Sequence, residues 1–280
     1  MGKILFMADL HDEFWRDPPR PNPAEPIDMV LLGGDLSTEG RHVEIMAGLA
    51  EQLECPVRAV RGNHEYYRSS MIEIIEREAN DIGFARAQGH DVGVLDRDVE
   101  VINGVRLIGA TLWTGLDACD PVDISLARRL VVRAMQDFRM ISVDREDPRL
   151  FQVKDWLREH HADRDFILSK LDEVHDGPTV VMTHHMPCRN LIHPKRLVRW
   201  EDALVSVGFA ADLEDEIQSR KVDYWFFGHS HDNMRMAIPG RHGDIEFLSN
   251  SRGYPGEGVS FDPNFVVEVG SPKIQVNPAP

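Results

Sequence analysis

An α/β fold with layered β-sheets flanked by helices is predicted by three features of the sequence. Five short, almost uninterrupted apolar runs are typical of strands that are buried on both faces. Helical patterns follow the second and the third of these runs, and the resulting β-α-β-α-β order predicts a layered sheet built with right-handed crossovers. A hairpin pattern around Asn103-Gly104 then indicates a second sheet that packs on the first.

The predicted elements follow in order along the chain. Strands are expected at residues 3–8, 28–32, 57–60, 180–183 and 224–227, with the hairpin at residues 99–108. The prolines between residues 12 and 26 predict a loop. Helices are expected over residues 38–53, with Thr38 as N-cap, over 69–81, with Ile72, Ile74 and Ile75 facing inward, and over 211–221. Strands at residues 234–238, 245–248 and 265–269 are expected to complete the second sheet.

Residues 115–177 interrupt this pattern. Helical periodicity covers residues 122–138 and 151–174, and none of the polar strand ends described below falls within the segment. We expect a helical cap inserted into a single domain that spans residues 1–280, because one elaborated α/β domain suits a chain of this length.

Charge and cysteine content limit the possible classes of protein. The net charge of −16 argues mildly against a long nucleic acid, which is bound through Lys and Arg, although an acidic surface also serves solubility. Cys55, Cys119 and Cys188 show no pairing pattern and are expected to be reduced thiols. No signal-peptide pattern and no apolar run of the roughly 20 residues that span a membrane is present. We therefore expect a cytoplasmic protein that does not contact membranes.

Each of the five apolar runs leads into polar residues of the kind that bind metal ions. These strand ends are Asp9-Leu10-His11, Gly34-Asp35, Gly62-Asn63-His64-Glu65, His184-His185 and Gly228-His229-Ser230-His231. Oxygen and imidazole ligands without thiolate suit Mn, Fe, Zn, Ni or Co better than Ca or Mg alone. Two Asp, one Asn and four His make seven ligands, which are too many for one tetrahedral ion. We therefore expect side chains from the whole sheet edge to converge on two ions that share a carboxylate, roughly 3.5–4 Å apart.

In this order and without substitution, the motifs resemble the calcineurin-like metallophosphoesterase superfamily over residues 9 to 231. Smaller similarities around Trp113 and at residues 250–254 resemble a bacterial and phage branch of phosphohydrolases. The resemblance implies a four-layer α-β-β-α sandwich and a phosphoester hydrolase that attacks phosphorus with a metal-bound hydroxide. It also implies two divalent or trivalent ions, with Mn, Fe or Zn as candidates.

The resemblance further implies a role for each motif residue. One ion would be held by Asp9, His11, Asp35 and His231, and the other by Asp35, Asn63, His184 and His229, with Asp35 bridging. His64 would face the scissile phosphate, where it would protonate the leaving oxygen or stabilise developing charge. The family pattern favours His184 over its neighbour His185, but the sequence alone leaves both open.

Substrate contacts are less constrained by the motifs. Arg252 and Arg139 are candidates for bidentate phosphate contacts, with structural ion pairs as the alternative. The aromatic residues near the motifs could stack on a base or aryl group; they are Phe14, Trp15, Tyr66, Tyr67 and Trp113. We expect a small phosphomonoester or phosphodiester as substrate. The alternatives are a nuclease acting on single-stranded nucleic acid and a non-catalytic metal-binding scaffold, which the complete motif set disfavours. The sequence gives no oligomeric state.

Overall fold

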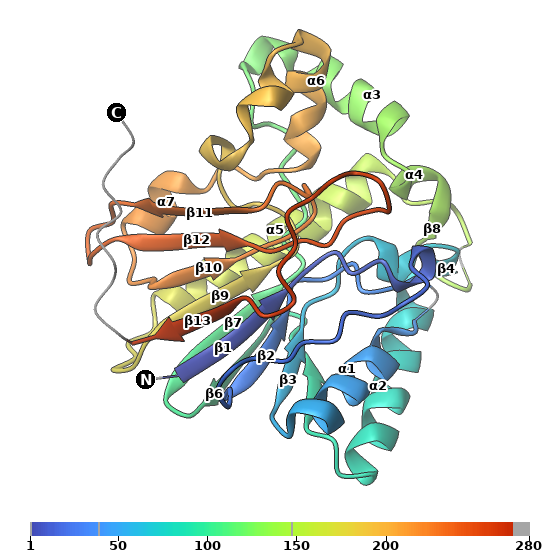
Figure 1. Ribbon diagram of the computed structural model, residues 1–280. Coiled ribbons are helices and arrows are strands. Elements are labelled where there is room, and N and C mark those ends of the chain that lie inside the picture. Colours follow the sequence, from blue (N-terminus) through green and yellow to red (C-terminus); the bar gives the residue numbers. More distant parts are fainter. Residues whose placement is uncertain (1, 39, 147, 271–280) are drawn as a thin grey trace.

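The computed structural model describes residues 2–38, 40–146 and 148–270, and its centre is a pair of β-sheets packed face to face (Figure 1). The first sheet has the strand order β13-β1-β2-β3-β5. These strands are β1 (Gly2–Met7), β2 (Met29–Leu32), β3 (Val57–Ala59), β5 (Val92–Val94) and β13 (Val266–Val269). All are parallel to their neighbours except β13, which pairs antiparallel with β1.

The second sheet has the order β11-β12-β10-β9-β7-β6. Its strands are β6 (Asp98–Ile102), β7 (Val105–Ala110), β9 (Thr179–Thr183), β10 (Tyr224–Phe226), β11 (Met234–Ile238) and β12 (Ile245–Ser249). The four central strands are parallel, and the edge strands β6 and β11 are antiparallel to their neighbours. A short pair, β4 (Ser69–Ser70) with β8 (Ile141–Ser142), lies outside both sheets.

Some of the helices pack on the outer faces of the two sheets, and others stand above the sheets. They are α1 (His42–Leu53), α2 (Met71–Ala87), α3 (Ile124–Ala134), α4 (Asp137–Met140), α5 (Val153–Leu171), α6 (Trp200–Val205) and α7 (Glu214–Gln218). Val43 and Met46 of α1 share a buried cluster with the outer face of the first sheet, whereas Ile167 of α5 and Ile217 of α7 share one with the second. Between the sheets, the rings of Phe6 and Phe226 lie 4.7 Å apart. The predicted four-layer α-β-β-α sandwich is therefore confirmed.

Two details of the strand assignment differ from the prediction. The strand expected at residues 265–269 joins the first sheet, where Leu5 faces Val266, because its side chains Val267 and Val269 fill the core between the sheets. The five polar strand ends also do not share one sheet edge. Three follow strands of the first sheet and two follow strands of the second, so the site forms where the two sheets meet.

The first two helices begin and end differently from the prediction. Helix α1 starts at His42, because the backbone N–H of Thr38 donates to Glu13 and the chain turns before the helix begins. Helix α2 runs to Ala87 from a Ser70 N-cap, whose side chain accepts from the N–H of Glu73. Within α2, Ile74 is buried as expected. Ile72 and Ile75, in contrast, are 43% and 39% exposed.

The segment predicted as a cap contains two kinds of helix. Figure 1 shows α3 standing with α6 above the sheets, whereas α5 lies along the second sheet. Ile167 and Leu171 of α5 belong to the core cluster of that sheet. We therefore propose that the part of residues 115–177 acting as a cap ends before α5. Both ends of the predicted domain, residue 1 and residues 271–280, lie outside the described residues. No helix in the described part is long and apolar enough to cross a membrane.

Candidate metal centre

The polar strand ends of both sheets meet in one place. Asp9 and His11 follow β1, Asp35 follows β2 and Asn63 follows β3, while His184 follows β9, and His229 with His231 follow β10. These residues and His64 form three groups, and within each group the ligand atoms lie within 4.8 Å of one another. The groups are Asp9 with His11 and His231, His11 with Asp35 and His64, and Asp35 with His184 and His229.

The first group contains Asp9, His11 and His231. The Nε2 atoms of His11 and His231 are 3.1 Å apart, and Nε2 of His231 lies 3.6 Å from Oδ1 of Asp9. On the other side of its ring, His231 Nδ1 lies 2.6 Å from Glu257. If Nδ1 donates to this carboxylate, the lone pair of Nε2 faces the cluster, an arrangement common among metal-binding histidines. The Ser251 hydroxyl donates to Asp9 in a similar supporting role.

Asn63, His184 and His229 form a second candidate metal site, and the two histidines belong to the third group above. His184 Nε2 lies 3.0 Å from Asn63 Oδ1 and 3.1 Å from His229 Nδ1. His184 Nδ1 lies 2.9 Å from the carbonyl oxygen of Gly33, to which it can donate, so that Nε2 is left as a free base facing the cluster. The geometry favours His184 over His185, whose Nδ1 faces the carbonyl of Thr111 and whose Nε2 is buried without a partner.

Asp35 lies between the group of Asp9, His11 and His231 and the second candidate metal site. Its Oδ2 atom is 3.9 Å from His11 Nε2 and 3.4 Å from His184 Nε2, so one carboxylate oxygen faces both. Its Oδ1 atom accepts from the backbone N–H of His64 at 2.8 Å. Glu65 accepts from the N–H groups of Asp35, Leu36 and Gly62 and thereby joins the loop after β2 to the loop after β3. This position is suited to a carboxylate that bridges two ions.

Five candidate ligands have left-handed backbone conformations. The φ angles are 49° for Asp9, 45° for His11, 52° for Asp35, 67° for His229 and 54° for His231. Residues other than glycine rarely adopt this region, although Asp and His do so more often than most, and the strain is typical of functional sites.

The electrostatics of the cluster favour bound cations. Asp9 and Asp35 are buried, and in the described part of the chain neither pairs with a lysine or arginine. Burial lowers the pKa of His184, but the charge of Asp35 outweighs this effect and raises that pKa to about 9. A buried site that draws a proton onto a histidine attracts positive charge. Together with the oxygen and imidazole donor set, this fits two transition-metal ions.

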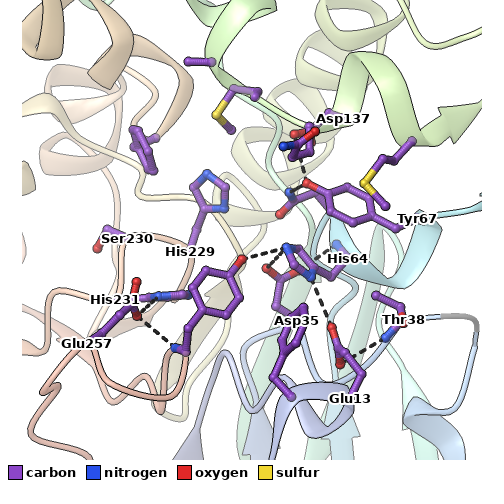
Figure 2. A pocket seen from close by; sticks show the side chains of 18 of the residues that line it. Glu13, Asp35, Thr38, His64, Tyr67, Asp137, His229, Ser230, His231 and Glu257 are labelled. Atoms are coloured by element: carbon purple, nitrogen blue, oxygen red, sulfur yellow. Dashed lines mark hydrogen bonds and ion pairs between the residues drawn. The ribbon is translucent and has the colours of Figure 1, made fainter.

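His64 lies at the edge of the cluster. Its Nδ1 is 3.3 Å from Glu13, its Nε2 is 3.0 Å from the hydroxyl of Tyr254, and its ring lies against Tyr67 with centroids 4.3 Å apart (Figure 2). Its Nε2 is also 3.9 Å from Asp35 Oδ2, so geometry alone would admit it as a ligand beside His11. Its predicted role as an acid stays a prediction.

A cavity of about 660 Å³ opens beside the cluster, and Tyr67 and Phe14 line it. The predicted phosphate contacts Arg252 and Arg139 are not among its lining residues. Arg252 lies over the ring of Trp15 at 4.1 Å and donates to the carbonyl of Asp17. Arg139 donates to Gln136 and to the carbonyl of Arg133. Tyr66 and Trp113 are buried in a core cluster and are therefore not available for stacking.

The sequence interpretation missed four charged residues that line this cavity, namely Arg68, Asp137, Arg196 and Glu257, and the contacts of two of them are informative. Arg196 donates to Asp232 at 2.8 Å and to the carbonyl of Ser230 at 2.6 Å, with its guanidinium 4.7 Å from the ring centre of Phe209. Asp137 is fully buried in α4. Neither belongs to a motif, and only the proximity of Asp232 to His231 in the sequence could have pointed to Arg196.

Comparisons with known proteins agree with this geometry. The family model described as calcineurin-like phosphoesterase matches residues 2–233. No match was found among curated proteins. Among solved structures, the crystal structure of a phosphopantetheinyl hydrolase from Mycobacterium tuberculosis matches with a TM-score of 0.64 and 17% identity, over 90% of each chain. At this identity the likeness shows a common fold.

Proposed function

Because the chain belongs to the calcineurin-like phosphoesterase family and is a phosphoric ester hydrolase, we propose that it cleaves a small phosphomonoester or phosphodiester with the aid of two transition-metal ions. The observation that carries this proposal is the position of Asp35, one oxygen of which faces both ligand groups. Asp9, His11 and His231 would complete one site, and Asn63, His184 and His229 the other. Mn, Fe and Zn suit these donors.

The chain's own residues divide the chemistry between them. When bound, the two ions would withdraw charge from the phosphate and acidify a water molecule that attacks phosphorus. His64 would hold a proton at Nε2, on the side of the leaving oxygen. Burial lowers the pKa of His64, but the charges of Asp35 and Glu13 raise it overall, which favours the protonated acid. Glu13 would fix the ring through Nδ1.

Arg196 is the residue we propose for anion recognition beside the metals. It shares the buried carboxylate of Asp232 with Lys195, so the three side chains together leave one positive charge. Its guanidinium is held in place by Asp232, Ser230 and Phe209, and its Nη1 atom has no acceptor within the described part of the chain. A preoriented guanidinium with a free donor is suited to a second phosphate or a carboxylate of the substrate.

A substrate panel with added Mn²⁺ tests the activity. It should include nitrophenyl and bis-nitrophenyl phosphate, mononucleotides and cyclic nucleotides, a phosphopantetheinyl ester, chosen from the name of the solved neighbour, and single-stranded DNA and RNA. We expect hydrolysis of one of the small esters, bound metal in the purified protein, and weak competition by long DNA. Tight, steeply salt-dependent competition by DNA or RNA would favour the nuclease. Bound metal without any hydrolysis would favour the scaffold.

Arg196→Ala tests the anion contact once a substrate is known. Loss of a hydrogen bond to a charged group, about 1.5–3 kcal/mol, should raise KM by about 10- to 100-fold while kcat changes little. Arg139→Ala is the matched control, because Arg139 is exposed and does not line the cavity. An unchanged KM for Arg196→Ala would remove it from the binding site.

A further inference from the structure

A chain of hydrogen bonds joins the insertion to the candidate metal centre. Nδ2 of Asn63 donates to the hydroxyl oxygen of Tyr67 at 2.8 Å, and that hydroxyl donates to Oδ2 of Asp137 at 3.2 Å. None of the three residues is more than 5% exposed. Figure 2 shows Asp137 above Tyr67, on the far side of Tyr67 from the metal cluster.

The direction of each hydrogen bond in this series depends on the next hydrogen-bonded residue, from Asn63 to Tyr67 to Asp137. An asparagine amide has nearly the same shape in its two flipped orientations, so only its partners decide whether oxygen or nitrogen faces a metal. The Tyr67 hydroxyl has one proton. Because Asp137 takes that proton, the hydroxyl oxygen is left to accept from Asn63, and the Asn63 oxygen then points to His184 at 3.0 Å.

We propose that Asp137 is a positioning residue for the metal site formed by Asn63, His184 and His229. Through the Tyr67 hydroxyl it holds the amide of Asn63 with the oxygen toward the metal. This inference rests on the proposed function, since it takes Asn63 as a ligand. Asp137 is the first residue of α4, which lies within residues 115–177. The insertion would therefore support the metal site in addition to covering the cavity.

The burial of Asp137 supports a role of this kind. A carboxylate without exposed surface and without a cationic partner is costly to keep in the folded state. Within the described residues its Oδ2 accepts from Tyr67, while Oδ1 is buried without a partner. Asp137 also lines the cavity, so a competing role is acceptance of a hydrogen bond from the substrate.

Mn²⁺ titrations of the full-length protein by calorimetry test the proposal without relying on activity. The variants are Asp137→Leu, which is similar in size but offers no acceptor to Tyr67, Tyr67→Phe and the double variant. Loss of a residue that orients a metal ligand typically weakens metal binding by about 10- to 100-fold, and we expect this loss at one of the two sites in each single variant. The double variant should bind no worse than Tyr67→Phe, because Asp137 then has no hydroxyl to act through. Gln136→Ala is the control, since its side chain contacts Arg139 and not Tyr67.

The outcomes separate this inference from the proposed function. If Asn63→Ala weakens Mn²⁺ binding and Asp137→Leu does not, the positioning role is wrong and the ligand assignment stands. If Asn63→Ala also has no effect, the ligand assignment itself fails. Additive losses in the double variant, or a change in KM alone, would also overturn the positioning role. Should Asp137→Leu fail to fold, Asp137→Ala, which also removes the acceptor, replaces it in the same set of variants.

Discussion

Replacing Gly62 with alanine should disable the candidate metal centre through a single added methyl group. A Cβ at this position would lie 2.1 Å from Oδ1 of Asp35, 2.7 Å from the backbone nitrogen of Asp35 and 2.7 Å from Cε1 of His184. Such contacts are hardly ever below 3.0 Å, so the Asp35 carboxylate or the loop must shift by about 1 Å. A displacement of this size at a reacting centre can lower the rate by on the order of 10². We expect a loss of that order in kcat/KM, with weakened binding of both ions.

The assay compares Gly62→Ala with Gly83→Ala. Gly83 lies in α2, and a Cβ there would meet nothing within 4 Å. The control should keep full activity and gain up to ~1 kcal/mol of stability from the better helix former. Bound metal, hydrolysis of bis-nitrophenyl phosphate and thermal unfolding are measured for both variants. If Gly62→Ala binds two ions and hydrolyses the substrate as fast as the wild type, Asp35 does not bind the metal ions from its position in this structure.

Three further predictions concern single residues. Asp35→Asn should lower bound metal and hydrolysis together, because both ions lose a charged ligand; retention of two ions at normal rate would refute the bridge. His64→Ala should keep both ions and lose on the order of 10²–10⁴ in rate, with a smaller loss for nitrophenyl esters, whose leaving group needs no proton. Thiol reagents at pH 8 should modify Cys119 before Cys55 or Cys188, since the latter two are buried and burial raises the pKa of Cys55 to about 11. Mass spectrometry of partly labelled protein would show the order.

The sequence located the candidate ligands because their chemistry and position repeat. Each apolar run that ends in Asp, Asn or His is a local pattern, and a strand that is buried on both faces needs no tertiary information to be identified. Asp9, Asp35 and His184 therefore fall where the strand ends predict. The division of the strands between two sheets depends on long-range pairing, which no local pattern encodes. The pairing of Leu5 with Val266 across almost the whole chain is the clearest case.

The residues beside the ligands were harder to predict for a different reason. Arg196 and Asp137 lie on irregular or short segments, and nothing in their neighbouring sequence distinguishes them from surface charges. The structure identifies them by what they contact: Arg196 through Asp232, and Asp137 through Tyr67. Arg252 and Arg139 are near motifs or within the insertion, but local hydrogen bonds hold them elsewhere. Proximity in sequence to a motif is thus weaker evidence for substrate contact than a fixed orientation in the cavity.

The left-handed ligands indicate how the two sheets and the site depend on each other. Glycine would adopt these φ angles with less strain, but it offers no donor atom, so Asp and His must be held there by their surroundings. The holding bonds come from other ligand loops: Asp9 N–H donates to Gly34, His11 N–H to Asp35, and His229 N–H to the carboxylate of Asp9. The last of these bonds crosses from the second sheet to the first. The ligand geometry can therefore form only after the two sheets have packed, which is why the sequence could supply the donor types but not their arrangement.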